Sequence, residues 1–317
     1  MVIHLAAIAL GMLLDRIIGD PPNWPHPVRF IGKLISGLTK KWNHPPHACR
    51  NGFAMVAVAV VLVFAIVYAI VTAAYAVHWS IGLIVEALLI ASGLAQKSLA
   101  DAGLLVHRPL LAGDLPEARN KLSWIVGRDT EHLSESEIVR GTVETVSENT
   151  GDGVTAPLFW AFLLGAPGLW LYKTVNTCDS MVGYKNERFE RFGFASARFD
   201  DVLNFIPSRM TGLLILLLTK NSTSRPFKER LYIWLRDARK HPSPNSGWLE
   251  AATAVQLGVQ LGGVNSYGGT TSERARMGEP LHALEARHIK ESVRHLNIAA
   301  LGFFILLVIG GICIELA

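Results

Sequence analysis

The sequence predicts an all-α, polytopic membrane protein in which broken or re-entrant helices surround a polar active site. Only 18% of its 317 residues are charged, whereas soluble domains carry about 25%, and the mean hydropathy is +0.31. Residues 53–77 contain no charge and are long enough to cross a bilayer. Two other apolar stretches are interrupted by Pro and Gly, which is tolerated at membrane depth only where protein or water covers the backbone.

The whole chain, residues 1–317, is interpreted as a single membrane-embedded helical domain. Its polar motifs fall between residues 97 and 296. The interrupted stretches 154–175 and 202–219 are predicted to be either spanning or re-entrant. The predicted spans are 2–19, 53–77, 80–96 and 297–316.

Basic residues suggest how the chain crosses the membrane. Segments 20–51, 97–153 and 220–296 hold five, six and twelve Lys and Arg residues, and 176–201 holds four. Because Lys and Arg favour the cytoplasmic side, we expect the three richer segments there. If 154–175 and 202–219 are re-entrant, everything from 97 to 296 is cytoplasmic, and this is the arrangement we favour.

Composition also excludes some classes of protein. The net charge of +4 fits contact with anionic lipid or phosphorylated ligands, but it is too small and too dispersed to predict nucleic-acid binding. The three cysteines form no CxxC pair and no cluster with histidine, so neither a disulfide framework nor a zinc site is expected.

A helical face between residues 140 and 152 is the first candidate for chemistry. Arg140, Glu144 and Glu148 recur at a spacing of four residues and share one face, and Asn149 and Asp152 follow in a Gly-rich segment. Such oxygen ligands suit Mg²⁺, which prefers one or two carboxylates plus substrate phosphate. The alternative is an Arg–Glu pair on a solvated helix face.

Further polar residues follow the interrupted stretch 154–175. Lys173, Asn176 and Ser180 (or Asp179) fall on one helical stripe, and Lys185 comes shortly after. Lys173 ends an apolar run, so it either extends to the membrane interface or binds a phosphate.

Two aspartates and an arginine mark the second interrupted stretch. Asp200, Asp201 and Asn204 are candidates to hold a metal. Arg209 lies inside an apolar run and needs an anionic partner. That partner is either a substrate phosphate or one of these aspartates.

A basic segment runs from Arg236 to His241 and ends in a Ser/Asn/Gly turn. Ser243 or Asn245 is expected to cap a helix that begins near Trp248, which creates an anion site at the helix N-terminus. Residues 262–271 are Gly-rich and are expected to be flexible, without the lysine of a P-loop. At the other end of the chain, Asp15, Arg16 and Asp20 are interpreted either as a capped helix end or as a polar cluster.

Taken together, these motifs resemble one family. The stretches that carry the resemblance are LLDRIIGDPPNWPHPVRFIG (13–32), the motif-rich segment 140–212 and DARKHPSPNSGWLEAATAVQLGVQLGGVNSYGG (237–269). The chain resembles the CbiB/CobD family of membrane amide synthases of cobalamin biosynthesis, the adenosylcobinamide-phosphate synthases. The resemblance covers nearly the whole chain.

The resemblance implies a reaction. An amide forms between a propionate of adenosylcobyric acid and the amine of aminopropanol phosphate, or a related amino-alcohol phosphate, with ATP and Mg²⁺. The implied partners are these substrates, membrane lipid and other late enzymes of the pathway, in the cytoplasmic membrane. The alternatives are a membrane transporter or an AmpE-like membrane sensor of the same fold.

Roles for the candidate residues follow as hypotheses. Mg²⁺ is assigned to Glu144, Glu148, Asp152, Asp200 and Asp201. Catalysis is assigned to Lys173 and to a base for the amine, Asp179 or His241. We expect Glu148, Lys173, Asp179 and Asp201 to meet in one cytoplasmic-facing site. Substrate and phosphate binding is assigned to Asn176, Ser180, Lys185, Arg209, Arg236, Ser243 and Asn245.

Overall fold

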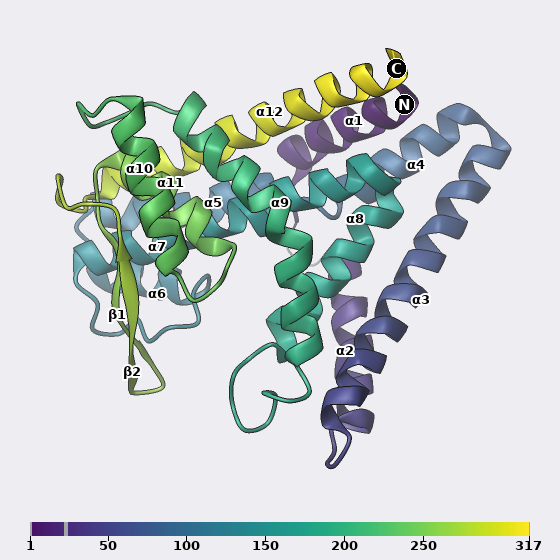
Figure 1. Ribbon diagram of the computed structural model, residues 1–317, viewed down its shortest axis with the longest axis horizontal. Helices are drawn as coiled ribbons and strands as arrows, with labels where there is room; N and C mark the ends of the chain where they lie inside the picture. The colour runs from purple at the N-terminus through teal and green to yellow at the C-terminus, as the bar shows by residue number, and fades with distance from the viewer. Residues whose placement is uncertain (1, 22–24, 317) are drawn as a thin grey trace. The chain divides into compact units, whose positions relative to one another are not determined.

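A computed structural model describes residues 2–21 and 25–316 (Figure 1). Residues 22–24, which belong to the first polar motif, lie outside the described part. The described chain is predominantly helical, as expected for the all-α class, and includes one small sheet. Its contacts group into two compact units, where the sequence analysis expects one domain. Unit 1 comprises Met1–Lys97, Ala156–Asn204 and Leu306–Ala317, and unit 2 comprises Ser98–Thr155 and Phe205–Ile305.

Unit 1 is built from long apolar helices. Here α1 packs on α4, α3 packs on α4 and α8, and α2 packs on α3 and α8. One residue, His78, joins α3 to α4 and caps the second helix through its ring nitrogen, which accepts from the Ser80 amide. The helices of this unit are α1 (Val2–Ile18), α2 (Pro27–Trp42), α3 (Ala48–Val77), α4 (Trp79–Ala91), α8 (Ala156–Val182), the start of α9 (Phe194–Leu218) and the end of α12 (Ala286–Leu316).

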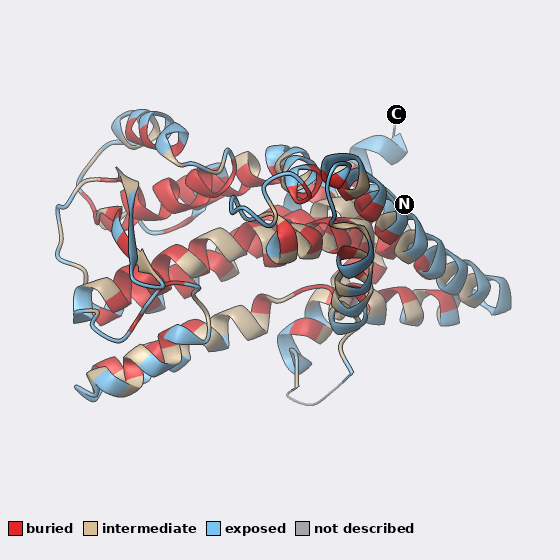
Figure 2. Ribbon diagram, turned by 90° about the horizontal axis from the view of Figure 1, so that it is seen from below, coloured by how far each residue is buried: buried red, intermediate tan, exposed pale blue. Residues whose placement is uncertain are grey.

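The surface of unit 1 indicates that lipid is its solvent. Large apolar side chains of α3, such as Val61, Ile66 and Ile70, are exposed, and this helix is pale blue along much of its length in Figure 2. In water such a surface would be a liability, but in a bilayer it is the expected outer face. Among the described residues, five helical segments are long and apolar enough to cross a membrane: Ala48–Val77, Trp79–Leu111, Glu135–Val182, Phe194–Leu218 and Ala286–Leu316.

The expected break in the stretch 154–175 is present. A single turn of π-helix, η1 (Gly151–Thr155), precedes α8, and α8 itself is interrupted at Gly165, where φ is 72° and ψ is −164°. Glycine alone adopts this conformation readily. The amide of Ala166, freed by the break, donates to Oε1 of Glu86 at 3.3 Å. Glu86 also accepts from the Tyr75 hydroxyl at 2.8 Å, so a buried carboxylate secures the broken helix.

The stretch 202–219, predicted to be either spanning or re-entrant, contains no break of the helix, and it belongs to one of the five segments long enough to span. Helix α9 continues through Pro207 from Phe194 to Leu218. Pro207 lacks the amide that would bond the Leu203 carbonyl, and this carbonyl accepts from the Trp160 indole nitrogen at 3.1 Å instead. Pro207 therefore lies inside a helix instead of ending it.

Unit 2 is organised around α11 (Ser246–Leu257), whose residues are all buried. It packs against α7 (Glu135–Thr150) and α10 (Phe227–Asp237). A helix buried on every side belongs to a core, and its end is set by Gly258 in the left-handed conformation. The remaining elements are most of α5 (Gln96–Leu111), α6 (Leu115–Ser123), the short η2 (Ala238–Lys240) and most of α12 (Ala286–Leu316).

A β-hairpin replaces the flexible loop expected at 262–271. Strand β1 (Leu261–Tyr267) pairs antiparallel with β2 (Thr270–Met277) through a turn at Gly268 and Gly269. Both glycines have positive φ, as the tight hairpin turns require. The carboxylate of Asp129 accepts from both glycine amides at 2.9 Å, which explains why this Gly-rich segment is ordered.

Candidate functional site

Two polar sites stand out, one within each unit. The site in unit 2 lies where α7, α11 and the hairpin meet. Helix α7 begins with a capping box, in which Ser134 and Glu137 each bond the other's backbone amide. This start places Glu144 and Glu148 on successive turns of a largely buried helix, as the spacing predicts.

Glu144 belongs to a buried ion network. Its Oε2 lies 2.5 Å from Arg128 and its Oε1 accepts from the Gly262 amide at 2.8 Å. Arg140 lies 3.7 Å away on the same helix and donates to the backbone carbonyls of Gly262 and Val264. The Arg140–Glu144 pair therefore joins α7 to β1 and does not form a solvated face. Arginine forms such buried, multiply bonded pairs because its five donors are fixed in a plane.

Glu148, one turn further along, is connected to α11. Its Oε1 accepts from the Ser246 hydroxyl at 2.8 Å, and the Ser246 amide donates to the Ser243 hydroxyl at 3.2 Å. The Ser243 hydroxyl thus accepts from the first amide of α11, although Asn245 occupies the N-cap position. Asn245 precedes the helix but makes no side-chain capping bond.

A buried histidine–carboxylate pair completes this site. Nε2 of His241 faces Oε1 of Glu250 at 3.5 Å, and neither atom makes a hydrogen bond to any described residue. Burial, together with the charges of Glu144 and Glu148, raises the pKa of Glu250 well above its usual range. Burial lowers the pKa of His241. The pair therefore favours a protonated carboxyl beside a neutral imidazole.

Arg274 of β2 balances the charge of this cluster. Burial acts to lower its pKa, but the nearby Tyr267, Glu250, Glu148 and Glu144 raise it overall. Its guanidinium also donates to the Tyr267 hydroxyl at 3.1 Å. Three glutamates, three arginines and one histidine thus surround the start of α11.

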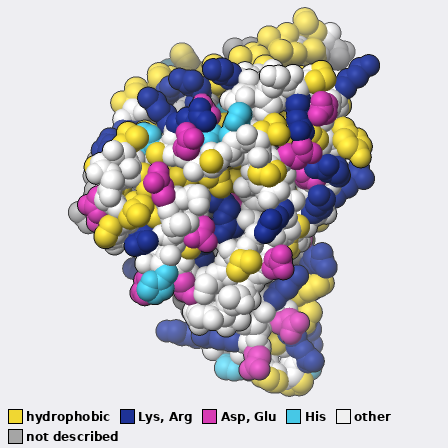
Figure 3. Space-filling model, turned by 90° about the vertical axis from the view of Figure 1, so that its left-hand side faces the viewer, with side chains coloured by type: hydrophobic (Ala, Val, Ile, Leu, Met, Phe, Trp, Pro, Cys, Tyr) yellow, Lys and Arg dark blue, Asp and Glu magenta, His cyan; other side chains and the backbone are white. Residues whose placement is uncertain are grey.

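Asp152, Arg209 and Arg236 also belong to unit 2. Asp152 lies in η1, one turn after Glu148. Arg209 donates to Asn245 at 3.2 Å and stacks on Phe205, 3.6 Å from the ring centroid. Among the described residues its partners are neutral oxygens and aromatic rings, and none is an aspartate. Arg236 pairs with Asp237 at 2.8 Å and lies 3.6 Å from Glu279. Lys and Arg side chains alternate with Asp and Glu on the face drawn in Figure 3.

The aspartate–asparagine cluster of unit 1 joins α8 to α9. Asp200 accepts from Asn176 at 3.1 Å and from Asn204 at 3.0 Å. Asn204 in turn accepts from the buried Tyr172 hydroxyl at 3.0 Å. Each carboxylate oxygen of Asp200 therefore already holds an amide donor. Asp201 points elsewhere and lies 3.7 Å from Arg198.

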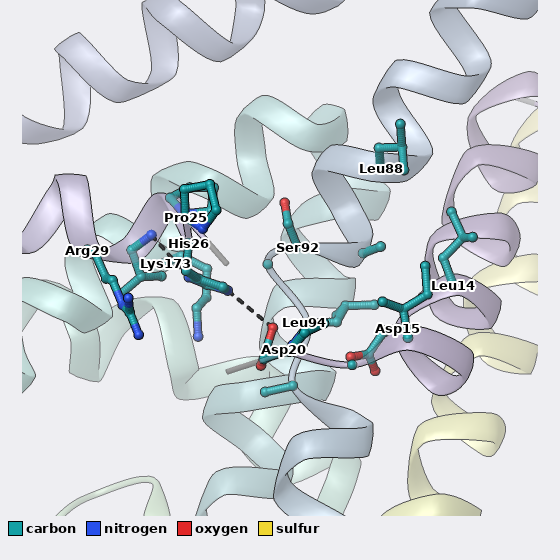
Figure 4. Close-up of a pocket in the computed structure, with 18 residues that line it drawn as sticks. Leu14, Asp15, Asp20, Pro25, His26, Arg29, Leu88, Ser92, Leu94 and Lys173 are labelled. Carbon is teal, nitrogen blue, oxygen red and sulfur yellow. Dashed lines mark hydrogen bonds and ion pairs between the residues drawn. The ribbon is translucent and has the colours of Figure 1, made fainter. Parts of the chain in front are cut away.

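A pocket of about 450 Å³ lies within unit 1, between the end of α1, the start of α2 and α8 (Figure 4). Asp15 and Asp20 contribute carboxylates, His26 and Arg29 come from the α2 end, and Lys173 comes from α8. Asp20 is held by His26 at 3.3 Å. Lys173 therefore lines a largely apolar pocket that also holds carboxylates, instead of extending along a lipid surface.

The other residues assigned from the sequence lie on or near the same half of α8. Asp179 and Ser180 are on its last turns, with the Ser180 hydroxyl donating to the Asn176 carbonyl at 2.9 Å, and Lys185 is exposed beyond the helix. Lys173, Asp179 and Asp201 belong to unit 1, whereas Glu148 belongs to unit 2. Their meeting in one site stays a prediction. Among the described residues, no group of three or more His, Cys, Asp or Glu is arranged to hold a metal ion.

Sequence reasoning missed four participants. They are Arg128, Glu250, Asn265 and Arg274, and no motif spacing marks them in the sequence. For Glu250 there was one signal, because it is the only charged residue between Trp248 and Gly263. A lone carboxylate in a helix that becomes buried needs a partner or a proton.

Fold and sites together define a polytopic helical membrane protein whose two polar sites are rich in carboxylates and cations. The comparisons with known proteins agree. The family model described as CobD/Cbib protein matches residues 8–296, and the chain belongs to this family. It is 52% identical over 308 residues to cobalamin biosynthesis protein CobD of Halalkalibacterium halodurans, which covers 97% of each chain.

Two further relatives also carry names from cobalamin biosynthesis. Cobalamin biosynthesis protein CobD of Klebsiella pneumoniae is 43% identical, covering 95% of this chain and 96% of the relative. Cobalamin biosynthesis protein CbiB of Salmonella paratyphi B is 42% identical with the same coverage. No solved structure matches the chain significantly. The family and these names place the protein in cobalamin biosynthesis.

Proposed function

We propose that this protein is an adenosylcobinamide-phosphate synthase of the cytoplasmic membrane. In an ATP-dependent reaction it joins adenosylcobyric acid to aminopropanol phosphate, or a related amino-alcohol phosphate, through an amide bond. Membership of the family supports the pathway. The main structural support for the reaction is the buried His241–Glu250 pair beside Glu148 in unit 2. Amide formation needs a group that takes a proton from the attacking amine.

The reaction requires an activated carboxyl group. Transfer of the γ-phosphoryl group of ATP to the propionate yields an acyl phosphate and ADP. Attack by the amine nitrogen then forms the C–N bond and releases inorganic phosphate. His241, whose lowered pKa leaves its imidazole neutral near pH 7, accepts the proton that the amine loses. The nearby carboxylate of Glu148 stabilises the resulting imidazolium. Asp179 is the alternative proton acceptor.

Part of the carboxylate set fits Mg²⁺. Glu148 and Asp152, one turn apart, meet the need of this ion for one or two carboxylates in addition to substrate phosphate. When bound, Mg²⁺ would neutralise charge on the transferred phosphoryl group. Glu144 and Asp200 fit less well, because their oxygens are engaged by arginines or amides. We assign those two positioning roles and keep Asp201 as a further candidate ligand.

The remaining assignments concern phosphate and substrate contacts. Phosphoryl transfer depends on positioning and charge stabilisation, so cations are needed near the phosphates. The residues assigned to these contacts are Lys173, Asn176, Ser180, Lys185, Arg209, Arg236, Ser243 and Asn245.

A reconstituted assay tests the proposal. Purified protein in lipid nanodiscs is incubated with adenosylcobyric acid, aminopropanol phosphate, ATP and Mg²⁺, and the amide product and ADP are quantified by mass spectrometry. Glu148→Gln and His241→Ala should each lower turnover by about a hundredfold, in the range typical of a lost acid–base group. Asp101→Asn, an exposed change on α5, should have no effect. Wild-type protein that forms no ATP-dependent amide, or that transports a substrate into vesicles without making product, would contradict the proposal.

A further inference from the structure

We propose that the pocket of unit 1 is the binding site for the amino-alcohol phosphate, and that it recognises this substrate as a zwitterion. Asp15 and Asp20 bind its ammonium group, and Lys173 and Arg29 bind its phosphate. This inference rests on the proposed function for the identity of the substrate, and with the amine held in unit 1 it assigns the proton acceptor to Asp179 of the same unit instead of His241 of unit 2. The site itself is argued from the side chains that line the pocket.

The charges that line the pocket are balanced. Two carboxylates and two permanent cations face the same space, together with His26 (Figure 4). A polyanion such as ATP would bring its phosphates against two aspartates, which is unfavourable at short range. A molecule with one cationic end and one anionic end can satisfy both sets at once. Charge complementarity therefore favours a zwitterion over a nucleotide.

One carboxylate, Asp15, lies at one end of the pocket and the two cations lie at the other (Figure 4). In Figure 4, Asp15 lies at the end of α1, whereas Arg29 and Lys173 lie on α2 and α8. Asp20 is drawn between them and is tied to His26 at 3.3 Å. This separation gives a small ligand a defined direction.

Asp15 provides a second, independent observation. Its side chain is 2% exposed. Its Oδ2 accepts from the Gln96 amide at 3.0 Å, whereas its Oδ1 makes no hydrogen bond to any described residue. A buried carboxylate without its full set of donors favours a cation nearby. Asp15 lines the pocket and gives this end of it negative charge, while Oδ1 itself has almost no accessible surface.

The rest of the lining suits a short alcohol backbone. Leu14, Ile18, Leu88 and Leu94 contribute apolar surface, and Ser92 contributes a hydroxyl. Small-molecule sites are typically mostly apolar, with a few polar groups that set orientation. The apolar surface can contact the carbon chain between the amine and the phosphate.

Isothermal titration calorimetry on the full-length protein in nanodiscs, without ATP or corrinoid, tests this inference. Three probes are used: 1-amino-2-propanol phosphate, 2-propyl phosphate, which lacks the amine, and 1-amino-2-propanol, which lacks the phosphate. Wild-type protein should bind the zwitterion at least tenfold more tightly than either truncated probe. Equal affinity for the zwitterion and 2-propyl phosphate would overturn the role of the carboxylates.

Variants then assign each end of the ligand. Asp20→Asn should weaken binding of the zwitterion about tenfold and leave 2-propyl phosphate unchanged, and Asp15→Asn should act in the same direction. Lys173→Met should weaken both phosphate probes and leave aminopropanol unchanged. Lys33→Met, an exposed change one turn beyond Arg29 on α2, is the matched control. If Asp20→Asn and Lys173→Met both bind the zwitterion like wild type, or if ATP competes with it, the assignment is wrong.

These outcomes are separable from those of the proposed function. Selective binding of the zwitterion without any amide formation would retain the site and reject the synthase activity. Amide formation with an unchanged KM for the amino-alcohol phosphate in Asp20→Asn and Lys173→Met would retain the activity and reject the site.

Discussion

The ring nitrogen Nε2 of His241 and the carboxylate oxygen Oε1 of Glu250 face each other at 3.5 Å in the interior of unit 2. The two residues come from different elements, the turn before α11 and α11 itself. Each is buried, and each has its pKa moved toward the neutral form, mainly by burial. The pair is therefore a point where pH acts on both stability and proton transfer.

Replacing Glu250 by Gln should remove a pH dependence of stability. Because its pKa is raised in the folded protein, Glu250 contributes stability that is present below its ordinary pKa of 4.5. That stability is lost as pH rises through the raised value. Because the pKa of His241 is lowered in the folded protein, the protein loses stability as pH falls below the ordinary histidine pKa of 6.5. Glu250→Gln should therefore remove the loss of stability at higher pH. The loss of stability at lower pH, which belongs to His241, should be unchanged.

Thermal unfolding in detergent across a pH series measures this effect. Glu273→Gln, on the exposed face of β2, is the control and should follow wild type throughout. A Glu250→Gln profile that also follows wild type throughout would show that the carboxyl group does not titrate in the expected range.

Truncating Arg128 should destabilise unit 2 strongly. Arg128→Ala removes the guanidinium that bonds Glu144 at 2.5 Å and Asn265 at 2.8 Å. The buried Glu144 carboxylate is then left without its nearest positive charge. Breaking a buried pair in this way costs about 3–5 kcal/mol. Chemical denaturation with a fluorescence readout measures the loss. The exposed pair of Arg287 and Glu285 offers the comparison, since Arg287→Ala should cost less than about 1 kcal/mol.

A double variant separates the charge from the packing. Arg128→Met with Glu144→Met removes both charges and should recover part of the stability lost in Arg128→Ala. A double variant less stable than the single one would show that the two residues act independently.

A side chain at Gly165 should weaken unit 1. An alanine there would have to adopt a φ of 72°, and its Cβ would lie 2.7 Å from Oε1 of Glu86. Backbone strain of this kind costs about 1–3 kcal/mol, so Gly165→Ala should lower the melting temperature in detergent. Gly37→Ala is the matched control, because nothing lies within 4 Å of its added Cβ. In a helix it should be neutral or stabilising by up to about 1 kcal/mol.

Glu86 should prove more important than its neighbour Tyr75. Tyr75→Phe removes one hydrogen bond to Glu86 and should cost about 0.5–1.5 kcal/mol. Glu86→Ala also leaves the Ala166 amide and His4 without this acceptor, so each unsatisfied group adds about 1–3 kcal/mol. Melting curves rank the variants, and Tyr68→Phe, at an exposed ring on α3, should match wild type. If Glu86→Ala melts at the wild-type temperature, the carboxylate does not hold the broken helix.

The sequence by itself determined membrane residence, the helical class and the family. Hydropathy is a property of short stretches, so the apolar spans could be read directly, and Gly165 with Pro167 marked the break in α8. The i,i+4 spacing placed Glu144 and Glu148 correctly on one helix. It did not reveal that Pro207 would continue a helix, because the side-chain bond near the proline forms only in the folded chain.

Only the tertiary structure decided which charged groups meet. Arg128 reaches Glu144 and Asn265, and Lys173 lines a pocket with Asp15, more than 150 positions earlier in the chain. Such partners leave no periodic signal, because a buried charge is stabilised by whatever opposite charge the fold brings to it, at any separation in sequence. The Gly-rich hairpin likewise depends on a residue distant in sequence, because the exposed carboxylate of Asp129 accepts from both glycine amides of its turn.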